Sequence, residues 1–342
     1  MLLTKREKEI LRSTVELYIE TGGPVSSRMV AKRHKGAFST ATFRNEMLSL
    51  EEKGFLVQVH AQSGRIPTPR GITYYVKNMI SSAETERPFP APPRVTEYDR
   101  FWESVSEDLS FHSQNAGFVL TPSFFSLKFS SIRLLRVGEN RCVIVLETLG
   151  KLVSTRVVSL ESDISQNDLD LFSQEVNLNF RGYSLEDVLR HLYLSSREQQ
   201  RRLHRFLSQL KNLVLSDHSP FDLFFRGEER LLEQIISKDM EKIKELISVL
   251  ENRRKLVSLL RQAKGQDEVT ILFAPDLGDD SFDNFTLVVS EYKVDDQSAG
   301  RIGVLGFPMM NYPRVYTLVK EMARNLSGYL YPPGQSDNEV YR

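Results

Sequence analysis

Apolar residues recur at helical spacing between residues 39 and 54, which is the clearest local pattern in the chain. Phe43, Met47 and Leu50 follow one another at i, i+4 and i+7, so they would form one buried stripe on a helix. Ser39 suits the N-cap, because its hydroxyl can accept a hydrogen bond from a free amide of the first turn. Gly54 suits the position after the last turn, where a left-handed backbone is common. The pattern predicts a helix with defined ends.

The other side of this helix would carry polar residues that suit nucleic acid. An arginine can bind guanine O6 and N7 or a phosphate, and an asparagine can bind adenine N6 and N7. The small side chain of Ala41 would let the helix lie close to a groove. We expect the DNA-binding residues of this helix to be Ser39, Thr40, Thr42, Arg44 and Asn45.

A short hairpin is predicted directly after the helix. Apolar and polar residues alternate over 57–60, which is the period of a half-buried strand. Ser63 and Gly64 provide turn chemistry, because glycine tolerates a positive φ. Arg65 would then lie at the tip of a wing, against the minor groove or a phosphate. We expect His60, Gly64 and Arg65 to bind DNA from this wing.

Two more helices precede the capped helix. A capping box at Thr4–Glu7 starts the first, and its periodicity continues to a Gly-Gly-Pro sequence that ends it. Ser26 can cap a short second helix, on which Arg28 and Lys32 would face outward and bind phosphate. Helix, helix, capped helix and hairpin in this order predict a winged helix-turn-helix, whose third helix enters the major groove.

A proline-rich stretch at 81–95 separates this head from the rest of the chain. Four prolines within six residues make it a stiff, extended linker. The patterns beyond it predict a helix at 96–113, strands at 117–120, 132–137, 141–147 and 152–159, a mostly helical stretch from 163 to 263, strands at 269–273, 285–290 and 301–306, and a helix at 314–330. A strand set that is interrupted by helices and then resumed indicates an α+β domain with another domain inserted into it.

The distribution of charge also distinguishes the head. The whole chain is neutral, with 45 basic and 45 acidic residues, but residues 1–80 hold 13 Lys and Arg against 7 Asp and Glu. A basic module on an acidic body would be attracted to phosphate. A basic solvated face without a nucleic acid partner is the alternative interpretation of the charge alone.

Composition argues against several other classes of protein. The single cysteine, Cys142, allows no intrachain disulfide, and its apolar strand favours a buried, inert thiol in a reducing cytosol. The six histidines lack metal-ligand spacing, so we expect no metal, no other cofactor and no enzymatic activity. The start of the chain does not have the pattern of a signal peptide, and no run approaches the roughly 18 apolar residues of a membrane span.

Two patterns in the middle of the chain leave alternatives open. The predicted helix at 184–210 carries arginines on its polar face, and a solvated face above a core or dimer stripe is favoured over a second nucleic acid contact, because Glu198 and several glutamines dilute the charge. The apolar cluster at 221–225 is either ordinary core or the anchor of a dimer.

Two blocks of motifs, one near each end of the chain, point to a known family. The first comprises Gly23-Pro-Val-Ser-Ser-Arg28, Ser39-Thr-Ala-Thr-Phe-Arg-Asn-Glu-Met47 and His60-Ala-Gln-Ser-Gly-Arg-Ile-Pro-Thr68, and the second comprises Gly300-Arg-Ile-Gly-Val-Leu-Gly306, Met310-Asn-Tyr312 and Leu326-Ser327. Both blocks resemble the HrcA family of heat-inducible transcription repressors. The first block is the more specific, and the middle of the chain diverges.

The chain departs from the usual pattern of that family at four places. Ser26 stands in place of Gly, Phe43 in place of Ile, and Gln62-Ser-Gly-Arg65 in place of Ser-Ala-Gly-Arg, changes that preserve size class or turn chemistry. After Gly306, the usual Pro-Thr-Arg-Met is Phe307-Pro-Met-Met310, so that Met309 replaces an arginine.

The resemblance implies an α+β, multidomain layout. A GAF-like α+β domain would contain an inserted, mostly helical dimerisation domain. The expected division is a winged helix DNA-binding domain at 1–80, the linker at 81–95, the first part of the GAF-like domain at 96–162, the inserted dimerisation domain at 163–265, the second part of the GAF-like domain at 266–330 and a tail at 331–342.

The resemblance also implies a mechanism. A homodimer would bind an inverted-repeat operator of the CIRCE type, upstream of heat-shock chaperone operons, in the bacterial cytoplasm at the nucleoid. The GroEL chaperonin would maintain the active repressor, and heat would draw GroEL away to misfolded proteins. The alternative is a winged-helix module for protein contact or ligand sensing without specific DNA binding, since fold does not fix function.

Overall fold

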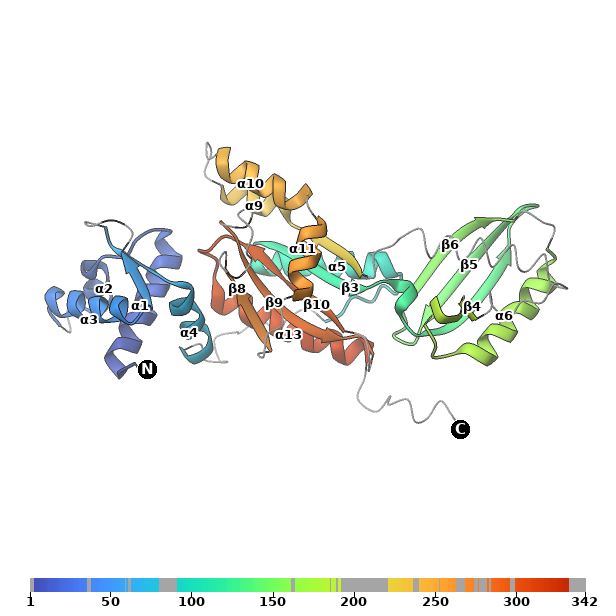
Figure 1. The fold of residues 1–342 in the computed structure, drawn as a ribbon, viewed down its shortest axis with the longest axis horizontal. Helices are drawn as coiled ribbons and strands as arrows, with labels where there is room; N and C mark the ends of the chain where they lie inside the picture. The colour runs from blue at the N-terminus through green and yellow to red at the C-terminus, as the bar shows by residue number, and fades with distance from the viewer. Residues whose placement is uncertain are drawn as a thin grey trace.

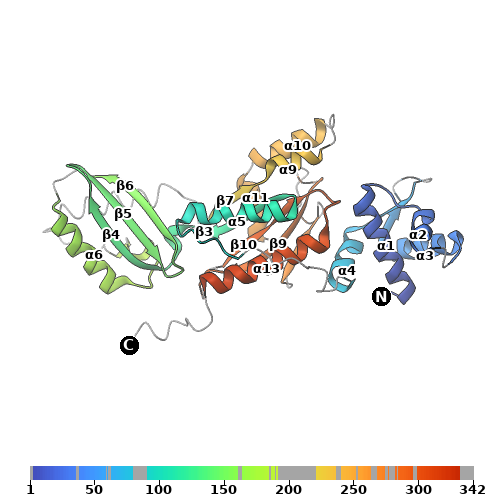
Figure 2. The same cartoon turned by 180° about the vertical axis from the view of Figure 1, so that it is seen from behind.

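Three bodies lie in a row in the computed structural model, with the winged helix at one end, a five-stranded sheet in the middle and a three-stranded sheet at the other end (Figures 1 and 2). The structure describes residues 3–35, 38–58, 60, 63–79, 91–160, 164–184, 186–188, 190–191, 221–235, 240–251, 253–262, 268–273, 276, 282, 284–295 and 299–331. The α+β, multidomain class expected from the sequence is confirmed.

The head has the expected order of elements. They are α1 (Lys5–Thr21), α2 (Ser27–Arg33), α3 (Thr40–Glu52), β1 (Leu56–Gln58), β2 (Arg65–Pro67) and α4 (Pro69–Met79). Thr4 and Glu7 form the capping box of α1, Ser26 caps α2 and Ser39 caps α3. Local capping chemistry therefore sets where these helices begin.

The middle body is an antiparallel sheet with the strand order β7-β3-β10-β9-β8. Its strands are β3 (Ala116–Pro122), β7 (Phe221–Arg226), β8 (Val269–Leu272), β9 (Thr286–Lys293) and β10 (Ala299–Gly306). Helices cover both faces, so the strands are apolar on both sides rather than alternating with polar residues.

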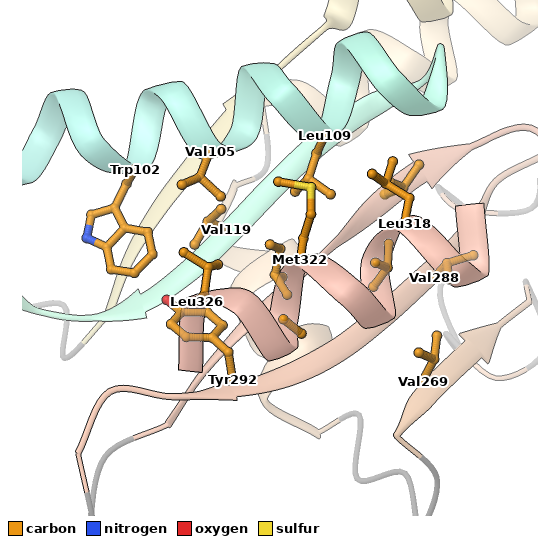
Figure 3. Close-up of a cluster of buried hydrophobic side chains, with 14 of the residues drawn as sticks. Trp102, Val105, Leu109, Val119, Val269, Val288, Tyr292, Leu318, Met322 and Leu326 are labelled. Atoms are coloured by element: carbon orange, nitrogen blue, oxygen red, sulfur yellow. The ribbon is translucent and has the colours of Figure 1, made fainter. Parts of the chain in front are cut away.

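One face of this sheet packs against α5 (Tyr98–Ser113) and α13 (Tyr312–Leu330). Figure 3 shows the contact, in which side chains of the two helices meet Val119, Val288 and Tyr292 of the sheet. The other face packs against α9 (Glu228–Gln234), α10 (Met240–Glu251) and α11 (Arg253–Gln262) through residues such as Phe118 and Leu287. Successive residues of a strand thus belong to different cores.

The third body is inserted between β3 and β7 and follows the short 3₁₀ helix η1 (Phe124–Ser126). It contains β4 (Phe129–Arg136), β5 (Arg141–Thr148) and β6 (Val153–Ser159), and α6 (Gln166–Phe180) covers one face of their sheet. Asn177 of α6 exchanges two hydrogen bonds with the backbone of Ile132, at 2.8 and 3.0 Å. This side chain satisfies backbone groups of the edge strand β4.

The two sheets divide the chain at positions that differ from the expected boundaries at 162 and 265. The strands β4, β5 and β6 do not join β3, although we assigned them to the same domain, and the described part of the insertion therefore includes a sheet. Residues 221–226 form an edge strand of the middle sheet, within the stretch from 163 to 263 that we expected to be mostly helical and without strands. Pairing with β3, which is distant in sequence, makes this segment a strand.

Most of the predicted helix at 184–210, much of the linker and all but one residue of the tail lie outside the described residues.

Candidate nucleic acid interface

Helix α3 presents a polar surface opposite its buried stripe. Phe43, Met47 and Leu50 are buried, as the spacing predicted. The exposed residues include Thr40, Arg44 and Asn45. No side-chain hydrogen bond or ion pair joins Arg44 or Asn45 to another described residue, so both side chains can reach an external partner.

Ser39 and Thr42 take part in the start of this helix. The Ser39 hydroxyl accepts a hydrogen bond from the Thr42 amide at 3.1 Å, and the two hydroxyl oxygens lie 2.9 Å apart. Ser39 is exposed and Thr42 is half-buried. Both residues therefore take part in capping α3, with Ser39 as the N-cap and Thr42 as its hydrogen-bond partner. Thr40, which lies between them in the sequence, is exposed.

Helix α2, which packs against α3, carries two exposed cations. The side chains of Arg28 and Lys32 make no hydrogen bond or ion pair with another described residue. The neighbouring Arg33 instead pairs with Glu16 and Glu20 of α1, at 3.0 and 2.9 Å. Helix α2 thus carries one cation that holds it to α1 and two that face outward, as the sequence predicted.

The wing differs from the expectation at Arg65. This residue begins β2, where its backbone exchanges hydrogen bonds of 2.8 and 2.9 Å with Val25 and its Nε donates to Glu51 at 2.9 Å. Arg65 therefore lies where the wing loop rejoins the hairpin, and it is held by internal partners instead of projecting from the tip. Gly64 also lies there, because a Cβ on it would lie 2.5 Å from the carbonyl of Val25. Only a glycine allows this close approach.

His60 is the expected wing residue that remains exposed. Its backbone amide donates to the Ser63 hydroxyl at 3.0 Å, and the Ser63 amide donates to the His60 carbonyl at 2.9 Å. These two bonds close the turn. The side chain of His60 is exposed and can reach a partner from the described part of the wing.

A buried carboxylate that we did not single out joins α1 to the end of α3. Glu7 accepts hydrogen bonds from the Thr4 amide and the Ser49 hydroxyl, each at 2.9 Å, and pairs with Lys53. Burial alone would raise the pKa of Glu7, but the bonds from Lys53, Thr4 and Ser49 outweigh it and lower the pKa to about 2. The capping box signalled Glu7, but no sequence pattern signalled the long-range bonds.

Three other features are relevant to the described part of the chain, namely a metal site, a membrane-spanning helix and a reactive thiol. No group of three or more His, Cys, Asp or Glu residues there could hold a metal ion. Within the described residues, no helix is both long and apolar enough to cross a membrane. Cys142 is buried in β5, and burial raises the pKa of its thiol to about 11.

The sequence is similar to a set of curated repressors. It is 33% identical to "Heat-inducible transcription repressor HrcA" of Desulforudis audaxviator (strain MP104C), over 96% of this chain and 98% of that protein. It is 28% identical to the protein of the same name from Pelotomaculum thermopropionicum, over 96% of this chain and 97% of the other.

A crystal structure and a family model extend these comparisons. The structure, described as that of a hypothetical protein, has a TM-score of 0.69 and 22% identity, covering 96% of this chain and 99% of that one, which supports the fold alone. The family model described as "HrcA protein C terminal domain" matches residues 99–316. The match across the body and the similarity along nearly the whole chain show that this protein belongs to the HrcA family of heat-inducible transcription repressors.

Proposed function

We propose that this chain is a homodimeric repressor that binds an inverted-repeat operator of the CIRCE type upstream of heat-shock chaperone operons. The observation that carries the proposal is the exposed polar surface of α3, on which Thr40, Arg44 and Asn45 make no side-chain bonds to other described residues. On this proposal the protein acts by binding and not by catalysis, at the nucleoid in the bacterial cytoplasm.

The geometry of a winged helix assigns a role to each part of the head. Helix α3 would enter the major groove, where Arg44 and Asn45 can read base edges. Arg28 and Lys32 on α2 would hold phosphates, which fix the register of the protein on DNA. His60 would contact the backbone or the minor groove from the wing. These polar side chains satisfy the two needs of sequence recognition, namely positioning and readout.

A homodimer follows from the symmetry of an inverted repeat. Each head would bind one half-site, and the half-sites should lie about 34–36 Å, or a multiple of this distance, apart. The insertion offers an apolar surface for such a dimer, because Leu135 and Val157 are 49% and 62% exposed on the sheet face opposite α6. Both residues pair in register with Val143 of the central strand β5.

The heat response would come from the chaperonin. We propose that GroEL maintains the repressor in its DNA-competent fold, and that misfolded proteins compete for GroEL at high temperature. Repression would then fall as free chaperonin falls. The support for this step is membership of a family of heat-inducible repressors.

A mobility-shift titration in rising salt, with and without purified GroEL, tests the proposal. The two probes are the inverted repeat and a scrambled duplex of equal composition. Selective binding that weakens steeply with salt and strengthens with GroEL is the expected result. Selective binding that is indifferent to GroEL would contradict the chaperonin step. Failure to select the inverted repeat even with GroEL would contradict operator binding and favour a protein-contact module.

A further inference from the structure

A single carboxylate holds both strands of the wing against the recognition helix. Glu51 lies in the last turn of α3. Its Oε1 accepts a hydrogen bond from the backbone amide of Gln58 in β1 at 3.0 Å, and its Oε2 accepts one from Nε of Arg65 in β2 at 2.9 Å. Gln58 and Arg65 face each other in the register of the hairpin. Glu51 therefore holds the two strands at the level where the wing loop begins.

This cluster is shielded from water enough to hold its geometry. The side chains of Glu51 and Arg65 are 26% and 11% exposed. A charge-assisted hydrogen bond in such a place is stronger and more directional than a surface ion pair. The backbone of Arg65 is also bonded in both directions to Val25, just before the cap of α2. Arg65 thus connects the wing to the elements that carry both proposed DNA-contact surfaces.

We propose that Glu51 and Arg65 are positioning residues for DNA recognition. The Glu51 carboxylate fixes the wing relative to α3, and Arg65 acts through that carboxylate instead of contacting a phosphate. The inference rests on the proposed operator binding and deepens it. It also replaces the expectation that Arg65 binds DNA from the tip of the wing.

The direction in which one substitution changes the affinity for DNA distinguishes a positioning role of Glu51 from a purely electrostatic one. Removing an acidic group from a DNA-binding head should by Coulomb attraction alone strengthen binding to DNA. Glu51→Gln keeps the shape of the side chain but removes the ionic bond to Arg65. If Glu51 positions the wing, the same change must instead weaken binding to the operator. Glu52→Gln is the matched control, because Glu52 is the next residue on the same helix and is exposed.

The experiment measures operator and scrambled-duplex affinities across a salt series for the full-length wild type and the variants. Glu51→Gln and Arg65→Gln should each weaken operator binding about tenfold, and the double variant should be no weaker than either alone. Arg65→Lys, which keeps a cation within reach of Glu51, should recover part of the loss. The slope of log affinity against log salt should stay unchanged in Arg65→Gln, since no phosphate contact is lost.

Two results would overturn the inference. One is operator binding by Glu51→Gln as tight as that of Glu52→Gln or the wild type. The other is a fall of about one in the salt slope of Arg65→Gln, which is the signature of a lost phosphate contact. Thermal unfolding of each variant checks that its head remains folded.

Amide hydrogen exchange of the DNA-free protein provides a second measurement. Exchange at the amides of Gln58 and Arg65 should rise in Glu51→Gln and stay at the wild-type level in Glu52→Gln, because only the former loses one of the two acceptor oxygens that hold the strands of the wing. Equal exchange in both variants would contradict the clamp. If the wild type itself does not select the operator, the proposed function fails, and the exchange measurement still decides whether Glu51 holds the wing.

Discussion

A Cβ placed on Gly22 would lie 3.4 Å from Sδ of Met309, so the end of α1 touches the loop that precedes α13. Helix α4 also contacts α13, and in both ribbon views it lies between the head and the five-stranded sheet (Figures 1 and 2). The head therefore packs directly on the middle body. Met309 supplies a flexible apolar side chain to this contact.

Substitution by alanine should destabilise the protein at Gly22 but not at Gly23. Gly22 ends α1 with φ at +67°, whereas a Cβ on Gly23 would meet nothing within 4 Å. Gly22→Ala should destabilise the protein by about 1–2 kcal/mol, because a side chain is strained in the left-handed region. Gly23→Ala should be neutral or slightly stabilising through the unfolded chain. Denaturant unfolding of both variants measures the difference, and equal losses would contradict it.

Glu7→Gln should destabilise the head, although it changes only one atom. The substitution removes the charge that pairs with Lys53 and weakens the bonds from Ser49 and Thr4. We expect a loss of about 1–3 kcal/mol in the free energy of unfolding, because the remaining partners are left incompletely satisfied. Glu9→Gln, at an exposed position of the same helix, is the control. A loss no larger than that of the control would argue against a bridge between α1 and α3.

The same carboxylate predicts how stability depends on acid. The pKa of Glu7 is lowered from 4.5 to about 2, so the folded state favours the ionised form. Its contribution is fully present above pH 4.5 and is lost as the pH falls from about 4.5 to 2. The unfolding temperature of the wild type should therefore fall more steeply in this range than that of Glu7→Gln. Parallel curves for the two proteins would contradict the lowered pKa.

Arg44 and Lys32 should contribute to DNA binding in different ways. If Arg44 is bidentate to a guanine, Arg44→Ala should cost about 1–3 kcal/mol and relax specificity at that base pair. Lys32→Ala should weaken all sequences about equally, because a phosphate contact carries no sequence information. Competition binding with a panel of single-base operator variants measures both effects. An equal loss of specificity in the two variants would refute these roles.

Cys142 should be unreactive in the native protein. It is buried in β5, and burial raises the pKa of its thiol to about 11, so little thiolate forms at neutral pH. A chromogenic disulfide reagent at pH 8 should label the protein only after denaturant is added. Because the chain has one cysteine, the signal has one source. Rapid labelling of the folded protein would show that β5 opens readily.

The sequence by itself determined the elements of the head, because their signals are local. A hydroxyl such as that of Ser39 caps the helix that follows it, and the stripe of Phe43, Met47 and Leu50 can be buried only if that helix forms. Such signals involve residues within one or two turns of each other, so they survive without knowledge of distant contacts. The exposed residues of α2 and α3 follow from the same periodicity.

Only the tertiary structure decided which strands pair and which charges are satisfied internally. A strand pattern does not name its partner, so nothing local could assign Phe221–Arg226 to the edge beside β3 or place β4, β5 and β6 in a separate sheet. The sequence pattern predicted that Arg65 is a free cation beside a turn. In the structure its guanidinium donates a hydrogen bond to Glu51, 14 residues earlier in the chain. Both outcomes depend on segments that meet only when the chain has folded, which is why periodicity and composition missed them.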